Sequence, residues 1–260
     1  MQAPFDAVIV AGGNLKTTDQ SDQTEQRGKA FLKLDGREMI EYIIDALAGV
    51  ERVRRVIVVA PPEAAMEPWT TRVETVLPVA GNAIDNMVAS FRYLQNTPIG
   101  ITDQVLLMTC DIPLITPAAI DDFLDQAERL EADILYPVMS RETMEDAYPE
   151  TKRTYGKLKE GTFTGGNLIL ANPVAVMANL ALIDEAFSLR KSVPKLMRFL
   201  GPKFIAKLLL HTLSITEIEN RASEMVNARA KAIVSTYPEM GIDVDKPADV
   251  DLVTRVLSAA

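Results

Sequence analysis

At 260 residues, with 48% hydrophobic and 24% charged side chains, the chain has the composition of a globular protein that buries a substantial core. Its net charge of −9 argues against a broad nucleic-acid-binding surface, because such a surface needs clustered Lys and Arg. The single cysteine, Cys110, excludes a disulfide framework, and no apolar run approaches the ~20 residues of a membrane-spanning helix. With no signal-peptide pattern at the start, we expect a cytoplasmic protein without stable membrane association.

Short β-branched runs alternate with segments of helical spacing over most of the chain. The predicted strands are Ala7–Val10, Val56–Ala60, Thr75–Val79, Val105–Thr109, Ile134–Val138 and Leu168–Ala171. The helices predicted between them are Met39–Leu47, Ile84–Leu94 and Ala118–Leu130. This alternation indicates an α/β fold with a Rossmann-like, mostly parallel sheet and helices on both faces. Ligands of such sheets bind beyond the carboxyl ends of the strands, so site residues should follow strands.

The pattern changes after Pro173. Consecutive helices are predicted over Ala175–Leu189, Pro194–Leu210 and Ile215–Val226, without strands between them. A late strand, Ala230–Ser235, and a closing helix, Pro247–Leu257, then complete the chain, with proline at the start of that helix. No internal repeat is present, and we predict a single domain over residues 1–260 with a helical insertion at 175–226.

Two adjacent glycines follow the first predicted strand, in the segment Ala11–Gly13, and a long polar stretch, Asn14–Gly28, comes next. A Walker loop is excluded because the nearby Lys16-Thr17 is preceded by leucine instead of glycine. A dinucleotide fingerprint is excluded too, since it needs G-x-G-x-x-G and an acid at the end of the second strand, which here ends in Ala60-Pro61-Pro62. The glycines either let backbone N–H groups approach a phosphate or form a tight turn. A polar loop this long is usually functional or disordered.

Five segments in order resemble the MobA-like NTP transferases, which share the nucleotide-diphosphosugar transferase fold. They read AVIVAGG with KAFLKLDGREMIEYIIDAL, then GNAIDNM, LLMTCDIPLITPAAI, TFTGGNLIL and GIDVDKPADVDL. Two departures from the family pattern stand near the first segment. Glu38 occupies a position where the family prefers proline, and the loop before Lys29 is longer than the family's, with Arg27 as the substitute for its arginine. The resemblance spans Ala7 to Leu252 and is weakest in the helical region.

The resemblance implies a Mg²⁺-dependent nucleotidyltransferase. An acceptor oxygen, expected to belong to a phosphate group, would attack the α-phosphorus of an NTP, and pyrophosphate would leave. A phosphate nucleophile is already anionic near neutral pH, so alignment and charge neutralisation would suffice without a general base. The implied partners are an NTP and a small phosphorylated acceptor, with no nucleic acid and with homodimer formation left open.

The expected site residues fall into four groups. The catalytic candidates are Lys29 and Asp111. Lys29 would neutralise charge on the α/β-phosphates. Asp111 would hold Mg²⁺, because a carboxylate after an apolar strand is a hard oxygen ligand. Asp243 and Asp245 both offer a further metal ligand. The nucleotide would contact Ala11, Gly12, Gly13, Arg27, Lys29, Gly81, Asn82 and Asn86, and the acceptor would contact Thr164, Gly165, Gly166 and Asn167.

Several of these candidates, and one run of charged residues, can also be explained by a structural role alone. Asn82 and Asn86 could simply cap the helix that begins there, and the Thr164–Asn167 segment could be a bulged turn. The run of Arg153, Lys157 and Lys159 could attract an anionic acceptor, although such a charge run is more often a solvated surface.

Two other functions fit the same resemblance. A glycosyltransferase of this fold would typically carry an Asp-x-Asp element, and the segment TCDIPL has a single acid. A non-catalytic nucleotide-binding protein could result from the altered glycine loop. Release of pyrophosphate on adding NTPs separates that alternative from the transferase.

Overall fold

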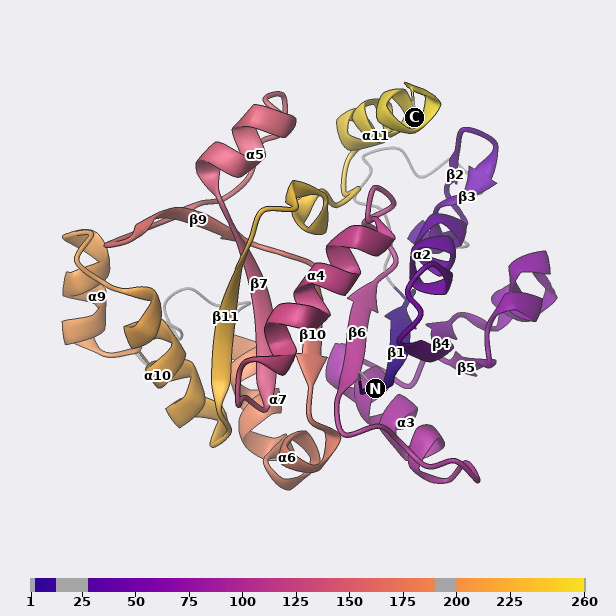
Figure 1. Ribbon diagram of the computed structural model, residues 1–260, viewed down its shortest axis with the longest axis horizontal. Helices are drawn as coiled ribbons and strands as arrows, with labels where there is room; N and C mark the ends of the chain where they lie inside the picture. Colours follow the sequence, from indigo (N-terminus) through magenta and orange to yellow (C-terminus); the bar gives the residue numbers. More distant parts are fainter. Residues whose placement is uncertain (1–2, 13–27, 190–199, 260) are drawn as a thin grey trace.

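One nine-stranded mixed sheet organises the computed structural model, which describes residues 3–12, 28–189 and 200–259 (Figure 1). Its strand order is β5-β4-β1-β6-β10-β7-β9-β8, with β11 beside β7. The strands are β1 (Phe5–Val10), β4 (Val53–Ala60), β5 (Thr75–Pro78), β6 (Val105–Thr109), β7 (Ile134–Ser140), β8 (Gly156–Leu158), β9 (Gly161–Gly165), β10 (Leu168–Ala171) and β11 (Ala230–Ser235). Strands β9 and β10 run against the others, and the core strands β5, β4, β1 and β6 are parallel, as predicted.

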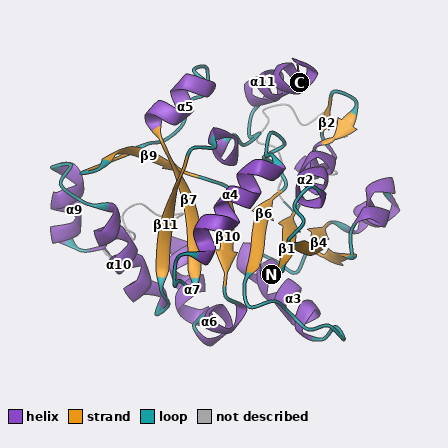
Figure 2. Ribbon diagram, viewed as in Figure 1, coloured by secondary structure: helices purple, strands orange, loops and turns teal. Residues whose placement is uncertain are grey.

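Helices cover both faces of this sheet (Figure 2). They are α2 (Met39–Ala48), α3 (Ala83–Gln95), α4 (Pro117–Glu128), α5 (Arg141–Ala147), α6 (Pro173–Ala178), α7 (Leu180–Leu189), α9 (Pro202–Leu209), α10 (Ile215–Val226) and α11 (Pro247–Ala259). A small hairpin of β2 (Lys33–Leu34) and β3 (Arg37–Glu38) precedes α2. Short 3-10 turns are η1 (Lys29–Phe31), η2 (Pro62–Met66), η3 (Pro68–Arg72) and η4 (Pro238–Gly241).

The predicted elements are largely confirmed, with two differences. The helix predicted over Ala175–Leu189 is divided at Asn179 into α6 and α7, and the acceptor-side strand predicted within Thr162–Leu170 is interrupted between β9 and β10. Of the helix predicted over Pro194–Leu210, the part up to residue 199 lies outside the described residues, and α9 begins at Pro202.

The sheet separates two apolar layers, which follow from the alternation of side chains along its strands. In β1, Ala7 and Ile9 join the larger layer with α2 and α4, whereas Val8 joins the smaller layer with α3. Phe123 of α4 and Phe91 of α3 are fully buried, one in each layer. The central strands are therefore buried on both faces, which explains their continuous apolar sequences.

The start of β1 carries a buried ion-pair network at the edge opposite the carboxyl ends of the parallel strands. The Asp6 carboxylate is fully buried and accepts hydrogen bonds from Arg54 and Arg55 over 2.7–3.2 Å. Thr102 N–H donates to the same carboxylate at 3.0 Å. Burial alone would raise the pKa of Asp6, but the two arginines and the backbone donor hold that pKa below its ordinary value.

Helix α4 shows how local sequence sets the geometry after β6. Thr116 caps it, its hydroxyl accepting from Ala119 N–H at 3.1 Å, and Pro117 occupies the first turn. The segment between Thr109 and Thr116 therefore carries Asp111 without that residue serving as the cap. Within the described parts of the chain, no helix is long and apolar enough to cross a membrane.

Candidate active site

Three carboxylates converge beyond the carboxyl ends of β6 and β11. One oxygen from each of Asp111, Asp243 and Asp245 lies within 4.8 Å of the others. A backbone hydrogen bond of 2.8 Å, from Val244 N–H to the Asp111 carbonyl, ties the two segments together. Val244 is itself fully buried, so the side chains on either side of it in the chain point back to Asp111.

Lys29 lies between two of these carboxylates. Its Nζ donates to Asp111 Oδ2 at 2.9 Å and to Asp245 Oδ1, and its side chain is 7% exposed. Burial alone would lower the pKa of Lys29, but the Asp111 and Asp245 carboxylates raise it above the ordinary lysine value. The ammonium group is therefore charged at neutral pH and neutralises part of the acidic group.

The three carboxylates suit a hard divalent cation such as Mg²⁺. Asp111 Oδ1 is buried and has no hydrogen-bond partner among the described residues, although a buried carboxylate oxygen normally has one. Burial raises the pKa of Asp243; Arg153 opposes this shift, and the neighbouring carboxylates of Asp111 and Asp245 add to it. A cation at this position would satisfy the orphan oxygen and relieve the repulsion among the acids.

Arg153 joins the carboxylates to the segment predicted to face the acceptor. Its Nη1 pairs with Asp243 Oδ1 at 2.6 Å, its Nε donates to Thr164 Oγ1 at 3.3 Å, and its Nη2 donates to the Gly165 carbonyl at 3.1 Å. The interpretation of the Arg153–Lys159 charge run as solvated surface is therefore wrong for Arg153, whose side chain is 15% exposed, and right for the exposed Lys157 and Lys159. Sequence spacing could not reveal this, because its partner lies 90 positions away.

The segment Thr164–Asn167, which we call the acceptor wall, comprises the last two residues of β9 and the two residues between β9 and β10. Gly166 N–H donates to the Pro137 carbonyl at 2.9 Å, and Asn167 N–H donates to the Met240 carbonyl at 3.0 Å. A Cβ on Gly166 would lie 2.9 Å from the Pro137 ring and 3.1 Å from the Met240 carbonyl, so the position requires glycine. The buried amide nitrogen Nδ2 of Asn167 has no hydrogen-bond partner among the described residues.

Two of the residues expected to contact the nucleotide, Ala11 and Gly12, come directly after β1. Ala11 is buried and donates its N–H to the Val59 carbonyl at 2.7 Å, and Gly12 follows it at the surface. A Cβ on Gly12 would come within 3.2 Å of Val79, so the chain passes close there. Gly13 and Arg27, like the rest of residues 13–27, lie outside the described residues.

The segment from Gly81 to Asn86 opens α3 and is held by its own side chains. Asn82 caps the helix, accepting from Ile84 N–H at 2.7 Å and from Asp85 N–H at 3.3 Å. Asn86 is buried and accepts from Ala80 N–H at 2.8 Å. A Cβ on Gly81 would collide with the Asp85 carboxylate, which itself accepts from Asn82 N–H. The capping role of Asn82 is thus observed, and its contact with a nucleotide stays a prediction.

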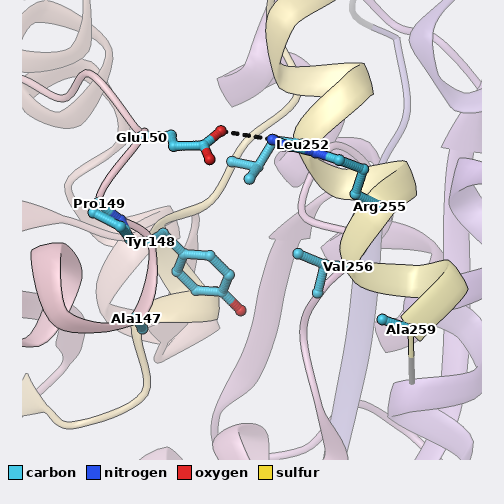
Figure 3. Close-up of a pocket in the computed structure, with 8 residues that line it drawn as sticks. All are labelled: Ala147, Tyr148, Pro149, Glu150, Leu252, Arg255, Val256 and Ala259. Atoms are coloured by element: carbon cyan, nitrogen blue, oxygen red, sulfur yellow. Dashed lines mark hydrogen bonds and ion pairs between the residues drawn. The ribbon is translucent and has the colours of Figure 1, made fainter.

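A separate hollow of about 440 Å³ lies between Ala147–Glu150 and α11 (Figure 3). An ion pair of 2.6 Å between Glu150 and Arg255 bridges its two sides. None of the three converging carboxylates lines it. We therefore assign it no part in the site.

Taken with the fold, this grouping of acids and lysine beyond the carboxyl ends of the strands fits a nucleotidyltransferase-type domain. The chain belongs to the MobA-like NTP transferase family, whose domain model matches residues 7–211. The resemblance found in the sequence is therefore confirmed. Asp243 and Asp245 lie beyond the matched region, and the fold brings them back to Asp111.

Solved structures give the same fold. A hypothetical transferase from Thermus thermophilus is 32% identical over 96% of this chain and 100% of that one, with a TM-score of 0.83. A CMP:2-keto-3-deoxy-manno-octonic acid synthetase complexed with CTP is 15% identical, with a TM-score of 0.60 over 100% of this chain and 99% of the other. Molybdopterin-guanine dinucleotide biosynthesis protein A from Archaeoglobus fulgidus is 11% identical, with a TM-score of 0.55 over 98% and 100%.

The last two likenesses, at such low identity, show the fold alone. A search of curated proteins finds no match to this chain. The α/β fold of nucleotide-diphosphosugar transferase type predicted from the sequence is confirmed by these structures.

Proposed function

We propose that the protein is a Mg²⁺-dependent nucleotidyltransferase that transfers NMP from an NTP to a phosphorylated acceptor and releases pyrophosphate. The observation that carries this proposal is the convergence of Asp111, Asp243 and Asp245 around Lys29. This group lies beyond the carboxyl ends of β6 and β11 and is joined to the acceptor wall by Arg153, at the sheet edge where α/β proteins bind ligands.

Each charged residue has a distinct task in this reaction. The three aspartates would hold Mg²⁺, which supplies charge neutralisation at the phosphates when it is bound. Lys29 would then turn from the carboxylates to the phosphates and stabilise the charge that develops there. Arg153 would keep Asp243 and the acceptor wall in place, because it bonds both.

The chemistry needs no proton acceptor from the protein. The acceptor phosphate oxygen forms a bond to the α-phosphorus, and the bond from that phosphorus to the leaving pyrophosphate breaks. His211, the sole histidine, is exposed beyond the end of α9. Burial raises the pKa of the Cys110 thiol far above its ordinary range, so Cys110 is no nucleophile despite its place beside Asp111.

A screen of the four NTPs against phosphorylated acceptors, with pyrophosphate as the readout, tests the proposal. Asp111→Asn should remove at least about 99% of the activity, since a metal ligand is lost while the shape is kept. The exposed Asp103→Asn serves as the matched control and should leave turnover unchanged. Full turnover by Asp111→Asn, or undiminished activity in excess EDTA, would rule out the metal assignment.

One observation keeps glycosyl transfer as a second candidate. Asp243 and Asp245 form an Asp-x-Asp element inside the site, although the segment around Asp111 has a single acid. A glycosyltransferase would release a nucleotide from a nucleotide sugar, whereas the proposed enzyme releases pyrophosphate from an NTP. Incubation with each class of donor, followed by assay of both products, separates the two functions.

A further inference from the structure

A cavity of about 610 Å³ is lined by residues of the sheet and of the helices α9 and α10. These two helices lie at the end of the molecule beside β11 (Figure 1). Its walls are almost entirely apolar. The sheet contributes Tyr136, Val138 and Phe163, and the helices contribute Phe204, Leu208 and Ile218. Its charged lining residues, Glu219 and Lys231, pair with each other at 2.8 Å. This lining offers few partners for ordered water, so the cavity suits an apolar ligand.

The helices over this cavity contact the sheet without filling the space between, since Glu219 and Ser223 of α10 accept hydrogen bonds from the β11 backbone. Neither α9 nor α10 has a buried residue, although both are amphipathic. Large apolar side chains facing the space keep substantial exposure, and Tyr136, Ile169 and Ile218 are each 36% exposed. Protein interiors normally pack far more tightly than this, so an added apolar group would complete the layer.

The cavity is continuous with the acceptor wall. Thr164 and Gly165 line the cavity, and the Arg153 guanidinium donates to both of them while it pairs with Asp243. A ligand with a phosphate near the carboxylate group and a hydrocarbon tail would therefore meet polar partners at one end and apolar walls at the other. The Tyr136 ring, which also lines the cavity, packs directly against Gly165, since a Cβ there would collide with the Tyr136 hydroxyl.

From this continuity we propose that the cavity holds the hydrocarbon tail of the acceptor, which is then a phosphate monoester of a long-chain alcohol, alkyl or isoprenoid in kind. The inference rests on the proposed nucleotidyl transfer for the position of the phosphate. A chain of ten carbons fills about 300 Å³ at roughly 30 Å³ for each water-sized group, about half of the space.

Binding of alkyl phosphates to the full chain tests this inference without turnover. Ethyl, butyl, hexyl and octyl phosphate are titrated calorimetrically, below their micelle concentrations and without nucleotide. Each methylene group that enters the cavity should tighten binding by up to about fourfold, so octyl phosphate should bind at least about 100-fold more tightly than ethyl phosphate. Equal affinity across the series would overturn the proposal.

Two variants test whether the hydrocarbon chain of the ligand lies in the cavity. Ala222→Trp fills the cavity from α10 and should weaken octyl phosphate at least tenfold while leaving ethyl phosphate unchanged. Asn220→Trp, on the exposed side of the same helix, is the matched control and should bind octyl phosphate like the parent. If Ala222→Trp misfolds, Ile218→Ser tests the same wall and should also weaken octyl phosphate. If a folded Ala222→Trp or Ile218→Ser variant still binds octyl phosphate as much more tightly than ethyl phosphate as the parent does, the assignment is overturned.

The same titrations separate this inference from the proposed function. One outcome is that octyl phosphate binds tightly, that Ala222→Trp or Ile218→Ser weakens this binding, and that the protein binds neither Mg²⁺ nor any NTP. This outcome supports the cavity as a site for the hydrocarbon tail and rejects the proposed transferase. Pyrophosphate release with short phosphorylated acceptors, together with no chain-length dependence, supports the transferase and rejects the cavity assignment.

Discussion

Removing the Lys29 ammonium while keeping its volume, as in Lys29→Met, should have opposite effects on metal binding and on catalysis. Three carboxylates would then lie within 4.8 Å of one another without the lysine that now pairs with two of them. Without metal, the variant should be less stable than the parent. With Mg²⁺, the carboxylates regain a counter-charge, and the ion no longer competes with an ammonium group.

The size of the effect follows from the exposure of the partners. Deleting one member of a fully buried ion pair costs about 3–5 kcal/mol, and screening by water lowers this toward about 2–3 kcal/mol. Such screening applies here because the Asp111 and Asp245 side chains are 17% and 27% exposed. For a domain of this size, about 2–3 kcal/mol corresponds to a fall in Tm of about 4–12 °C.

Calorimetric melting in EDTA and in saturating Mg²⁺ measures both effects. In EDTA the variant should melt below the parent, and Mg²⁺ should raise its Tm by more than it raises the parent's. Pyrophosphate release should nevertheless fall at least about 100-fold, because Lys29 no longer neutralises the phosphates. Lys33→Met, at an exposed position in β2, is the control and should change none of these values. Equal melting of Lys29→Met and the parent in EDTA, with no response to Mg²⁺, would refute the reasoning.

The remaining predictions concern Asp6 and Arg153. Asp6→Asn should lower the free energy of unfolding by about 3–5 kcal/mol near neutral pH, because the buried Arg55 and the partly exposed Arg54 lose their carboxylate. The pKa of Asp6 is lowered in the folded protein, so this contribution is present above the ordinary aspartate pKa and lost as pH falls through the folded-state value. Urea unfolding near neutral pH and at about pH 3 should show the difference shrink in acid, with Asp103→Asn as the inert control; a constant difference would contradict the prediction. Arg153→Met should raise the KM for the acceptor about tenfold, and Arg153→Lys should recover little, because lysine cannot make the forked contacts to Asp243 and the acceptor wall. An unchanged KM in pyrophosphate-release kinetics would remove Arg153 from the acceptor side.

The sequence predicted the sheet well because its central strands are short, β-branched and bounded by polar segments. Val105–Thr109 and Ala230–Ser235 begin and end where predicted. The break within Thr162–Leu170 was harder to place, because the sequence left Thr164–Asn167 open between a segment that contacts the acceptor and a bulged turn. Gly166 and Asn167 leave the strand to bond Pro137 and Met240, and these partners come from distant parts of the chain.

The acids of the site could be predicted from their positions after strands, but their arrangement could not. Spacing left Asp243 and Asp245 as alternatives, and both reach the group because Val244 between them is fixed to Asp111. The lysine's contacts with Asp111 and Asp245 bridge 82 and 216 positions, which no local pattern encodes. The apolar cavity is likewise a tertiary feature, since α9 and α10 have ordinary amphipathic sequences.

The distance along the chain between Lys29 and Asp245 has a consequence for biosynthesis. Ribosomes extend a chain at about 5–20 residues per second, and N-terminal parts begin to fold first. While β1, β4 and β6 assemble, the segment that carries Asp243 and Asp245 has not yet been translated, and neither has Met240, which anchors the acceptor wall. A nascent chain therefore holds Lys29 and Asp111 without Asp243 and Asp245, and the group of three carboxylates is complete only after β11 has docked against β7.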